Sequence, residues 1–280
     1  MNQNQYLVGS EELRNAFPFV EIIEKQGEGG QKFVYKANYG SVGKVAFKII
    51  KVDQNIERTV REITAASGFK PPRFAEIYKF GQAKVNDEEV IYIVEEFIEG
   101  DTLRNRIING RVSQDEATYI GVQLLYAVSE VSKQKLVHRD LKPENIMIDP
   151  NMRVVLLDFG IARHLELNSL THDAAIFGPH TPGYAAPEQI KNEKRAISTR
   201  TDLFSWGVIM YEMINNTNPF THGCTTSSEA ILKTLKYQPP SLNNCNPELS
   251  KLIDWCLQKP VHRRPPNIEI LIKKMEGVLK

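Results

Sequence analysis

The chain has 280 residues, with 35 lysines and arginines against 34 acidic residues and a formal net charge of +1. Apolar residues make up 41% and charged residues 25%, which are ordinary values for a globular protein with a sizeable core. The length exceeds one typical domain and falls short of two. Because the charges nearly balance, no overall field attracts nucleic acid or an anionic membrane, and we expect no nucleic-acid partner.

Cysteine usage and the N-terminal residues bear on location. Cys224, Cys245 and Cys256 are scattered and odd in number, which argues against a disulfide framework or a zinc site and favours a reducing compartment. The first twenty residues lack the basic start and apolar run of a signal peptide. No apolar stretch approaches the roughly 18 residues needed to cross a bilayer. We therefore expect a cytoplasmic protein without a membrane anchor.

The first third of the chain reads as strands with one helix. Its short segments are rich in β-branched and aromatic residues and are separated by glycine turns. Helical spacing over Asn55–Ser67 ends at Gly68 and predicts the helix. The expected strands are Phe19–Gln26, Phe33–Asn38, Lys44–Lys51, Ala75–Phe80 and Val90–Glu96.

From residue 100 onward the pattern becomes helical. Ser113 with Glu116 forms a capping box that opens a long helix with one apolar face. Thr201–Asn215 is apolar on most faces, which indicates a helix buried in a core. Asn246 followed by Pro247 opens a further helix. The pattern predicts a small sheet-rich lobe, a hinge near residues 96–100 and a larger helical lobe.

Two strings in the strand-rich part are suited to phosphate binding. Gly27–Val34 lies between the first two expected strands, where glycines let backbone amides approach phosphate oxygens. A tight hairpin turn would use the same residues. Val45–Lys48 ends in a lysine on the third strand, and Glu62 on the next helix is fourteen positions further along, where it could pair with Lys48. A chance surface pair is worth under about 1 kcal/mol, so neither string decides the function.

Two further strings do decide it. His138–Asn145 (HRDLKPEN) follows the long helix, and Asp158–Gly160 (DFG) follows a short apolar strand. Asn145 and Asp158 carry oxygen ligands suited to Mg²⁺, while Asp140 can accept a proton from an attacking hydroxyl. DFG alone is common by chance, but both strings at this spacing are typical of protein kinases.

On these motifs the chain resembles the eukaryotic-type protein kinase family over roughly residues 19 to 278. Ala186–Glu188 (APE) stands where the family closes its activation segment, and Asp202–Gly207 opens the buried helix. Arg264 stands where the family's arginine pairs with the glutamate of the APE motif, here Glu188. Lys142, two residues after Asp140, is the form typical of serine/threonine kinases.

The resemblance implies an α+β, bilobal protein-kinase-like fold. A small antiparallel β-sheet lobe with one helix would accompany a larger, mainly helical lobe. The expected divisions are an N-terminal extension over residues 1–18 and a kinase domain over 19–280, with the N-lobe and hinge over 19–98 and the C-lobe over 99–280.

The resemblance also implies a role for each motif residue. Lys48, held by Glu62, would contact the α- and β-phosphates of ATP, and Lys142 would stabilise charge on the transferred γ-phosphoryl group. Asp140 would orient the substrate hydroxyl. Asn145 and Asp158 would hold the metal ions, Mg²⁺ with Mn²⁺ as the alternative. The residues expected at the nucleotide are Gly27, Gly29, Gly30, Val34, Ala46, Lys48 and the backbone of Glu96 and Ile98.

The implied activity is phosphoryl transfer to serine or threonine hydroxyls of protein substrates, and to the chain itself by autophosphorylation. A pseudokinase that binds nucleotide or acts as a scaffold is one alternative, but Lys48, Glu62, Asp140, Asn145 and Asp158 are all present. A small-molecule kinase is another, and the APE and Asp202–Gly207 motifs argue against it.

Three positions depart from the family pattern. Lys32 replaces the third glycine of the phosphate loop, and we expect a solvated loop lysine, with an added phosphate contact as the alternative. Glu95 falls at the gate of the pocket behind adenine, where an apolar residue or threonine is usual. Because a buried carboxylate needs a partner, we expect it to pair with a cation or water.

The stretch where the family carries its activating phosphosite has no hydroxyl here, so Ile176 and Phe177 are predicted to hold that segment by packing. Further candidate residues of the segment are Ser169 and Thr171 for phosphorylation and Thr181 for contact with Asp140 and Lys142.

Overall fold

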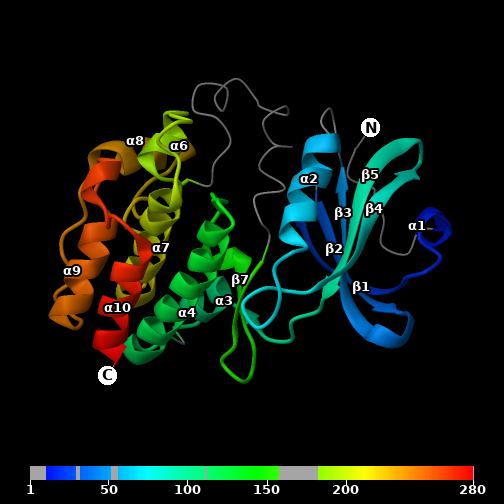
Figure 1. The fold of residues 1–280 in the computed structure, drawn as a ribbon, viewed down its shortest axis with the longest axis horizontal. Coiled ribbons are helices and arrows are strands. Elements are labelled where there is room, and N and C mark those ends of the chain that lie inside the picture. Colours follow the sequence, from blue (N-terminus) through cyan, green and yellow to red (C-terminus); the bar gives the residue numbers. More distant parts are fainter. Residues whose placement is uncertain (1–10, 30–31, 52–55, 111, 158–181, 280) are drawn as a thin grey trace. The chain divides into compact units, whose positions relative to one another are not determined.

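The computed structural model describes residues 11–29, 32–51, 56–110, 112–157 and 182–279. This part of the chain falls into two compact units, which divide between Glu99 and Gly100. One unit is built on a sheet and the other on helices, and Figure 1 shows the elements of each.

The sheet unit contains five antiparallel strands in the order β1-β2-β3-β5-β4. Each strand lies where the sequence pattern predicts one, although β1 and β4 extend several residues beyond their expected ends. A 3-10 turn, η1 (Gly40–Val42), joins the second and third strands. The bounds are β1 Glu21–Gly29, β2 Lys32–Tyr39, β3 Gly43–Lys51, β4 Ile77–Val85 and β5 Glu88–Glu96.

Alternation along the strands gives this sheet two different faces. One face carries the hydrophobic core of the unit, to which β3 contributes Val45, Phe47 and Ile49, and to which β5 contributes Val90, Tyr92 and Val94. Residues at the intervening positions face the other way. This second face therefore carries Ala46 and Lys48 from β3 and Glu95 from β5.

Two helices accompany the sheet, one of them unexpected. Helix α2 (Ile56–Ala66) matches the predicted helix. Helix α1 (Glu11–Ala16) was not predicted, and it lies on the opposite side of the sheet from α2 (Figure 1). Leu13 and Phe17 are completely buried, and the Phe17 ring lies 5.0 Å from that of Phe47. Residues that precede position 19 thus belong to the core of the sheet unit.

The helical unit begins with a small sheet and continues as packed helices. Its three strands are β6 (Asp101–Thr102), β7 (Ile146–Ile148) and β8 (Val154–Leu156). The remaining elements are α3 Leu103–Ile108, α4 Gln114–Lys133, η2 Pro143–Asn145, α6 Pro187–Ile190, α7 Thr199–Asn215, α8 Ser227–Lys236, α9 Pro247–Cys256, η4 Val261–Arg263 and α10 Ile268–Leu279.

Local signals in the sequence account for how these helices begin. The Ser113 hydroxyl accepts from the N–H of Glu116 at 3.2 Å, and the Glu116 carboxylate accepts from the N–H of Ser113 at 2.9 Å. This confirms the predicted capping box of α4. The Asn246 side chain likewise accepts from the N–H groups that open α9.

Helix α7 forms the centre of the helical unit. Every residue from Thr201 to Met213 is buried, as the apolar pattern predicts, and α7 packs against both α4 and α9. The indole of Trp206 donates to the carbonyl of Gly121 on α4 at 2.9 Å. A Cβ at Gly121 would lie 2.4 Å from the sulfur of Met210, so a larger residue there would have to displace the Met210 side chain.

None of the helices in the described ranges combines the length and apolar character that crossing a bilayer would require.

Candidate active site

The predicted site residues fall into two groups, one in each unit. In the sheet unit, the central feature is an ion pair between the ammonium of Lys48 and the carboxylate of Glu95. Both side chains are nearly inaccessible to solvent, with exposed fractions of 5% and 9%. The expectation that Glu95 pairs with a cation is confirmed, and that cation is the predicted phosphate-binding lysine.

The pairing of β3 with β5 brings these two side chains together. Ala46 lies opposite Glu95, and Lys48 lies opposite Ile93, so Lys48 and Glu95 are diagonal neighbours on one face of the sheet. A diagonal pair on antiparallel strands is within reach of a long side chain. The contact therefore depends on the register of β3 against β5.

Glu62, the expected partner of Lys48, lies on α2. Its side chain is outside the described residues, so the pair of Lys48 with Glu62 stays a prediction.

The glycine string lies at the end of the β1–β2 hairpin. Gly27 is paired with Val34 and Gly29 with Lys32. A Cβ placed on Gly27 would meet no atom within 4 Å, so the backbone is open to a ligand at that position. Gly30 lies outside the described residues.

Lys32 differs from the loop residue that we expected. It is the first residue of β2, it is half-buried, and it lies opposite Ile50 on β3 as well as Gly29 on β1. Its φ is not among the positive values of the described non-glycine residues. Because the strand holds Lys32 in ordinary extended backbone, the replacement of glycine causes no strain at this position.

Two residues at the end of β5 were expected to contact the adenine edge through their backbone. The N–H of Glu96 donates to the carbonyl of Glu76 at 2.8 Å, so an adenine contact at Glu96 would involve its carbonyl. Ile98 follows shortly after the strand, with a buried side chain.

In the helical unit, three predicted catalytic residues form one cluster. The Asp140 carboxylate accepts from the side-chain nitrogen of Asn145 at 3.0 Å and lies 2.9 Å from the ammonium of Lys142. Asn145 also donates to the backbone carbonyl of Asp140 at 2.9 Å. The carboxylate remains about one-fifth exposed, so it can still reach a substrate hydroxyl.

Asp202 on α7 holds the backbone that precedes Asp140. Its two carboxylate oxygens accept from the N–H groups of His138 and Arg139, each at 2.8 Å. Arg139 has a φ of +66°, a left-handed conformation that costs an L-residue roughly 1 kcal/mol or more. The hydrogen bond that the N–H of Arg139 donates to Asp202 offsets that cost.

The His138 ring joins the catalytic string to the segment that follows β8. Its Nδ1 accepts from the N–H of Asp140 at 3.3 Å, which leaves the proton on Nε2, and Nε2 donates to the carbonyl of Leu157 at 3.2 Å. Leu157 directly precedes the predicted metal ligand Asp158. The ring is almost completely buried, so it has a structural role in aligning these segments.

Asn145 is suited to bind a hard cation. Its nitrogen is engaged by Asp140, so its carbonyl oxygen is the atom that a metal would contact, and Mg²⁺ prefers oxygen ligands. The other predicted ligand, Asp158, lies outside the described residues. Within the ranges that the structure does describe, no three His, Cys, Asp or Glu residues gather as a metal site would require.

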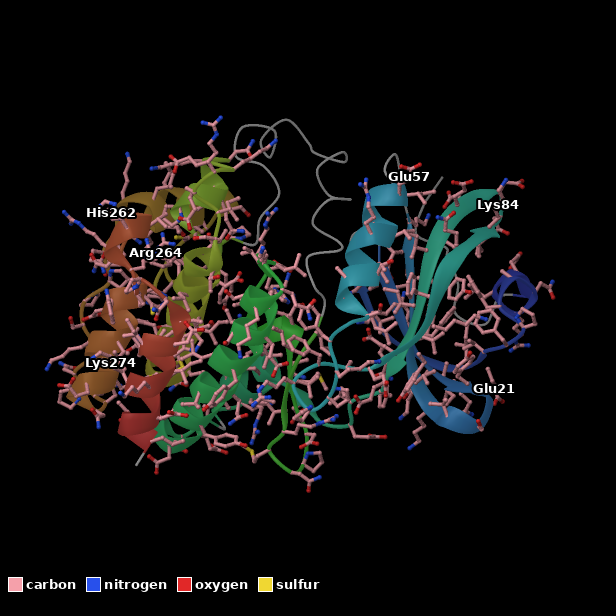
Figure 2. All side chains as sticks on the ribbon, in the orientation of Figure 1. Glu21, Glu57, Lys84, His262, Arg264 and Lys274 are labelled. Carbon is pink, nitrogen blue, oxygen red and sulfur yellow. The ribbon has the colours of Figure 1, made fainter. Side chains whose placement is uncertain are left out.

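The buried pair between Glu188 and Arg264 agrees with the expectation from the family. Two guanidinium nitrogens of Arg264 bind the two carboxylate oxygens of Glu188 at 2.7 and 2.9 Å, and neither side chain is more than 1% exposed. Arg264 also donates to the carbonyls of Gln258 and Arg200. Figure 2 shows Arg264 among the helices of this unit, where it ties the APE motif to the segment before α10.

Sequence reasoning missed a second polar network in the helical unit. Arg104 on α3 binds Glu144 of the catalytic string at 2.7 Å and Glu212 of α7 at 2.7 Å. The Tyr184 hydroxyl contacts both Arg104 and Glu212. Burial, together with the charge of Glu212, raises the pKa of Tyr184, so its hydroxyl stays protonated. An arginine near the start of a short helix gave no signal of this role.

The expectations for the activation segment concern residues outside the described part of the chain. They are the roles of Ser169, Thr171, Ile176, Phe177 and Thr181.

Comparison with known proteins agrees with this geometry. The chain is 30% identical over 267 residues to the serine/threonine-protein kinase PrkC of Bacillus subtilis, covering 93% of this chain and 40% of that protein. It is 33% identical over 256 residues to the serine/threonine-protein kinase PknB of Mycolicibacterium smegmatis, covering 88% of this chain and 40% of that protein. A probable serine/threonine-protein kinase of Clostridium perfringens is 30% identical over 267 residues, or 93% of this chain and 38% of its own length.

The chain thus spans about two-fifths of the length of these relatives. Residues 20–274 match the family model of the protein kinase domain. That match covers most of the chain, and the fold, the Asp140 cluster and the Glu188–Arg264 pair agree with it. The chain belongs to the protein kinase domain family.

Proposed function

We propose that this chain is an ATP-dependent serine/threonine protein kinase that transfers the γ-phosphoryl group to hydroxyls of protein substrates and of the chain itself. The cluster of Asp140, Lys142 and Asn145 carries this proposal, because it combines a proton acceptor, a cation and a metal ligand within hydrogen-bond distance. Mg²⁺ is the proposed metal ion, with Mn²⁺ as the alternative.

The chain's own residues act mainly by positioning and by neutralising charge. Asp140 orients the substrate hydroxyl and accepts its proton, and the contacts from Asn145 and Lys142 hold the carboxylate in place for this step. Lys142 stabilises charge on the transferred group, and Lys48 binds the α- and β-phosphates. Asn145 and Asp158 hold the metal ions, which neutralise charge on the phosphate oxygens when bound.

A protein rather than a small molecule is the proposed substrate. The APE motif is held by the buried Glu188–Arg264 pair and adjoins α7, and these are the elements that distinguish protein kinases from small-molecule kinases. We also propose residues 19–98 as the N-lobe with hinge and 99–280 as the C-lobe. A cytoplasmic location is supported by three cysteines that are all unpaired.

Incubation with labelled ATP and Mg²⁺, followed by mass spectrometry, tests the proposal. We expect phosphoserine or phosphothreonine on the chain or on a generic protein substrate, and we expect chelation of the divalent ion to abolish it. Transfer that persists without the ion, or label that appears only on small molecules, would contradict the proposal.

A further inference from the structure

An acidic residue stands at the gate position of the sheet unit, and it is joined to the phosphate-binding lysine. The side chains of Glu95 and Lys48 are both at most 9% exposed, so the ion pair between them lies almost entirely out of solvent. The roles that the family pattern implies do not include a carboxylate at position 95.

The two carboxylates that could pair with Lys48, those of Glu95 and Glu62, lie on different elements. Glu95 lies on β5, the strand directly hydrogen-bonded to the β3 strand that carries Lys48. Glu62 lies on α2, a separate element. A carboxylate fixed by the β3–β5 ladder keeps its distance to Lys48 as long as the sheet is intact, whereas a carboxylate on a helix depends on where the helix lies.

Because the Lys48–Glu95 contact is buried, its loss would be energetically costly for both side chains. A buried carboxylate or ammonium that loses its partner is strongly unfavourable, so each side chain constrains the other. An ammonium has three donors, so Lys48 can keep one hydrogen bond to Glu95 and direct the others at phosphate oxygens. Glu95 can therefore hold Lys48 without preventing it from binding ATP.

We propose that Glu95 is a positioning residue for Lys48, which fixes the ammonium within the sheet and makes its alignment largely independent of Glu62. This inference rests on the proposed function, in which Lys48 binds the phosphates of ATP. Glu95 itself does not touch the nucleotide; it acts through Lys48.

A set of substitutions separates positioning from general stability. Glu95→Gln removes the charge at constant shape, Glu95→Asp keeps the charge on a shorter side chain, and Glu62→Gln removes the charge on α2. Glu88→Gln is the matched control, because Glu88 forms an ion pair with Lys51 at 2.8 Å between the same two strands but on the surface. Each variant is compared for kcat/KM of ATP, for the Kd of Mg·ATP by direct titration, and for thermal unfolding.

We expect Glu95→Gln to lower kcat/KM for ATP by about tenfold and to weaken Mg·ATP binding, because the negative charge that holds the Lys48 ammonium is lost. Glu62→Gln should have a smaller effect, Glu95→Asp an intermediate one, and Glu88→Gln none. In a Lys48→Met background, Glu95→Gln should not weaken nucleotide binding further. A purely structural role would lower the unfolding temperature and leave the Kd of the folded protein unchanged.

The outcomes distinguish this inference from the proposed function. If the wild type transfers phosphate, and Glu95→Gln has a kcat/KM for ATP at least as high as the wild type and binds Mg·ATP at least as tightly, the inference is overturned and the proposed function stands. If the wild type transfers none, the proposed function fails, and the Kd series decides the inference by the same criteria. If Glu95→Gln does not fold, Glu95→Asp decides: a loss of about threefold or more supports the inference, and wild-type values overturn it.

Discussion

Asp202 accepts a hydrogen bond at 2.8 Å from the backbone N–H of Arg139, the residue immediately before the proposed catalytic aspartate. Asp202 belongs to α7, the most deeply buried helix of its unit, and is itself 1% exposed. The catalytic loop is therefore fixed to a rigid core element through its backbone. The same carboxylate holds the N–H of Arg139, whose φ is positive.

We expect Asp202→Asn to destabilise the fold by about 1–3 kcal/mol, because an amide cannot accept with both of its terminal atoms and one buried N–H loses its partner. The rate of phosphoryl transfer should fall as well, since Asp140 follows the affected residues. Urea denaturation and kcat measurements check this. Asp115→Asn, at an exposed position in the first turn of α4, is the control and should change neither quantity. An unchanged kcat in Asp202→Asn would contradict the positioning role.

The Glu188–Arg264 pair should matter far more than a surface pair of the same type. Arg264→Met leaves the carboxylate of Glu188 buried without its main partner, and we expect a loss of about 3–5 kcal/mol. Lys251→Met breaks the exposed pair with Glu248, where both side chains are at least 66% accessible, and should cost under about 1 kcal/mol. Denaturant unfolding compares the two variants, and similar losses in both would show that burial does not control the strength of the Glu188–Arg264 pair.

Because the ammonium of Lys259 is buried, we expect the stability of the protein to depend on pH. Its ammonium nitrogen is buried without a hydrogen-bond partner and lies 3.9 Å from the centre of the Phe220 ring. Burial, and to a smaller degree the charge of Arg264, lower the pKa of Lys259 from 10.5 to about 7. Between pH 7 and 10.5 the unfolded chain holds a proton that the folded protein lacks, so this residue makes stability rise with pH in that window.

The slope from one such group approaches about 1.4 kcal/mol per pH unit. Lys259→Met should remove this slope. From pH 7 to pH 9 the wild type should therefore gain stability relative to the variant, so that the difference in unfolding free energy between them shrinks or reverses. Urea denaturation at several pH values measures this. A difference that stays constant across the range would show that the ammonium remains charged over the Phe220 ring.

Phe17 should contribute as much to the stability of the sheet unit as a core residue on one of its strands does. It is completely buried and contacts the rings of Phe47 and Tyr92 at 5.0 and 5.4 Å. We expect Phe17→Ala to cost about 3–5 kcal/mol. Ile23→Ala, on β1 at a position that is 49% exposed, is the control and should change stability by about 0.5 kcal/mol or less. Equal effects of the two substitutions would mean that the segment directly after α1 is not part of the core.

The catalytic string could be recognised from the sequence because its residues are close together in the chain. The capping box at Ser113 and the apolar pattern of α7 are local signals too, and both were predicted correctly. Helix α1 was missed because its six residues carry only one buried apolar side chain, Leu13, which is too few for a periodic pattern.

Contacts that depend on pairing between distant segments could not be predicted from the sequence in this way. Strand β3 pairs with β5 rather than with its neighbour in sequence, β4, and this register decides that Lys48 meets Glu95. Sequence reasoning indicated that Glu95 needs a partner but could not identify it. The motif that contains Asp202 was recognised, but the two N–H groups that it binds lie more than sixty residues away, beyond any local pattern.

The rate of phosphoryl transfer from ATP in wild type and Asp140→Asn is the decisive test of the proposed kinase activity. Asparagine preserves the shape of the side chain and its contact with Lys142, but it cannot accept the proton of a substrate hydroxyl. We predict a loss of at least about a hundredfold in kcat with nucleotide affinity nearly unchanged. Transfer at the wild-type rate in Asp140→Asn would contradict the assignment of Asp140 as the catalytic residue.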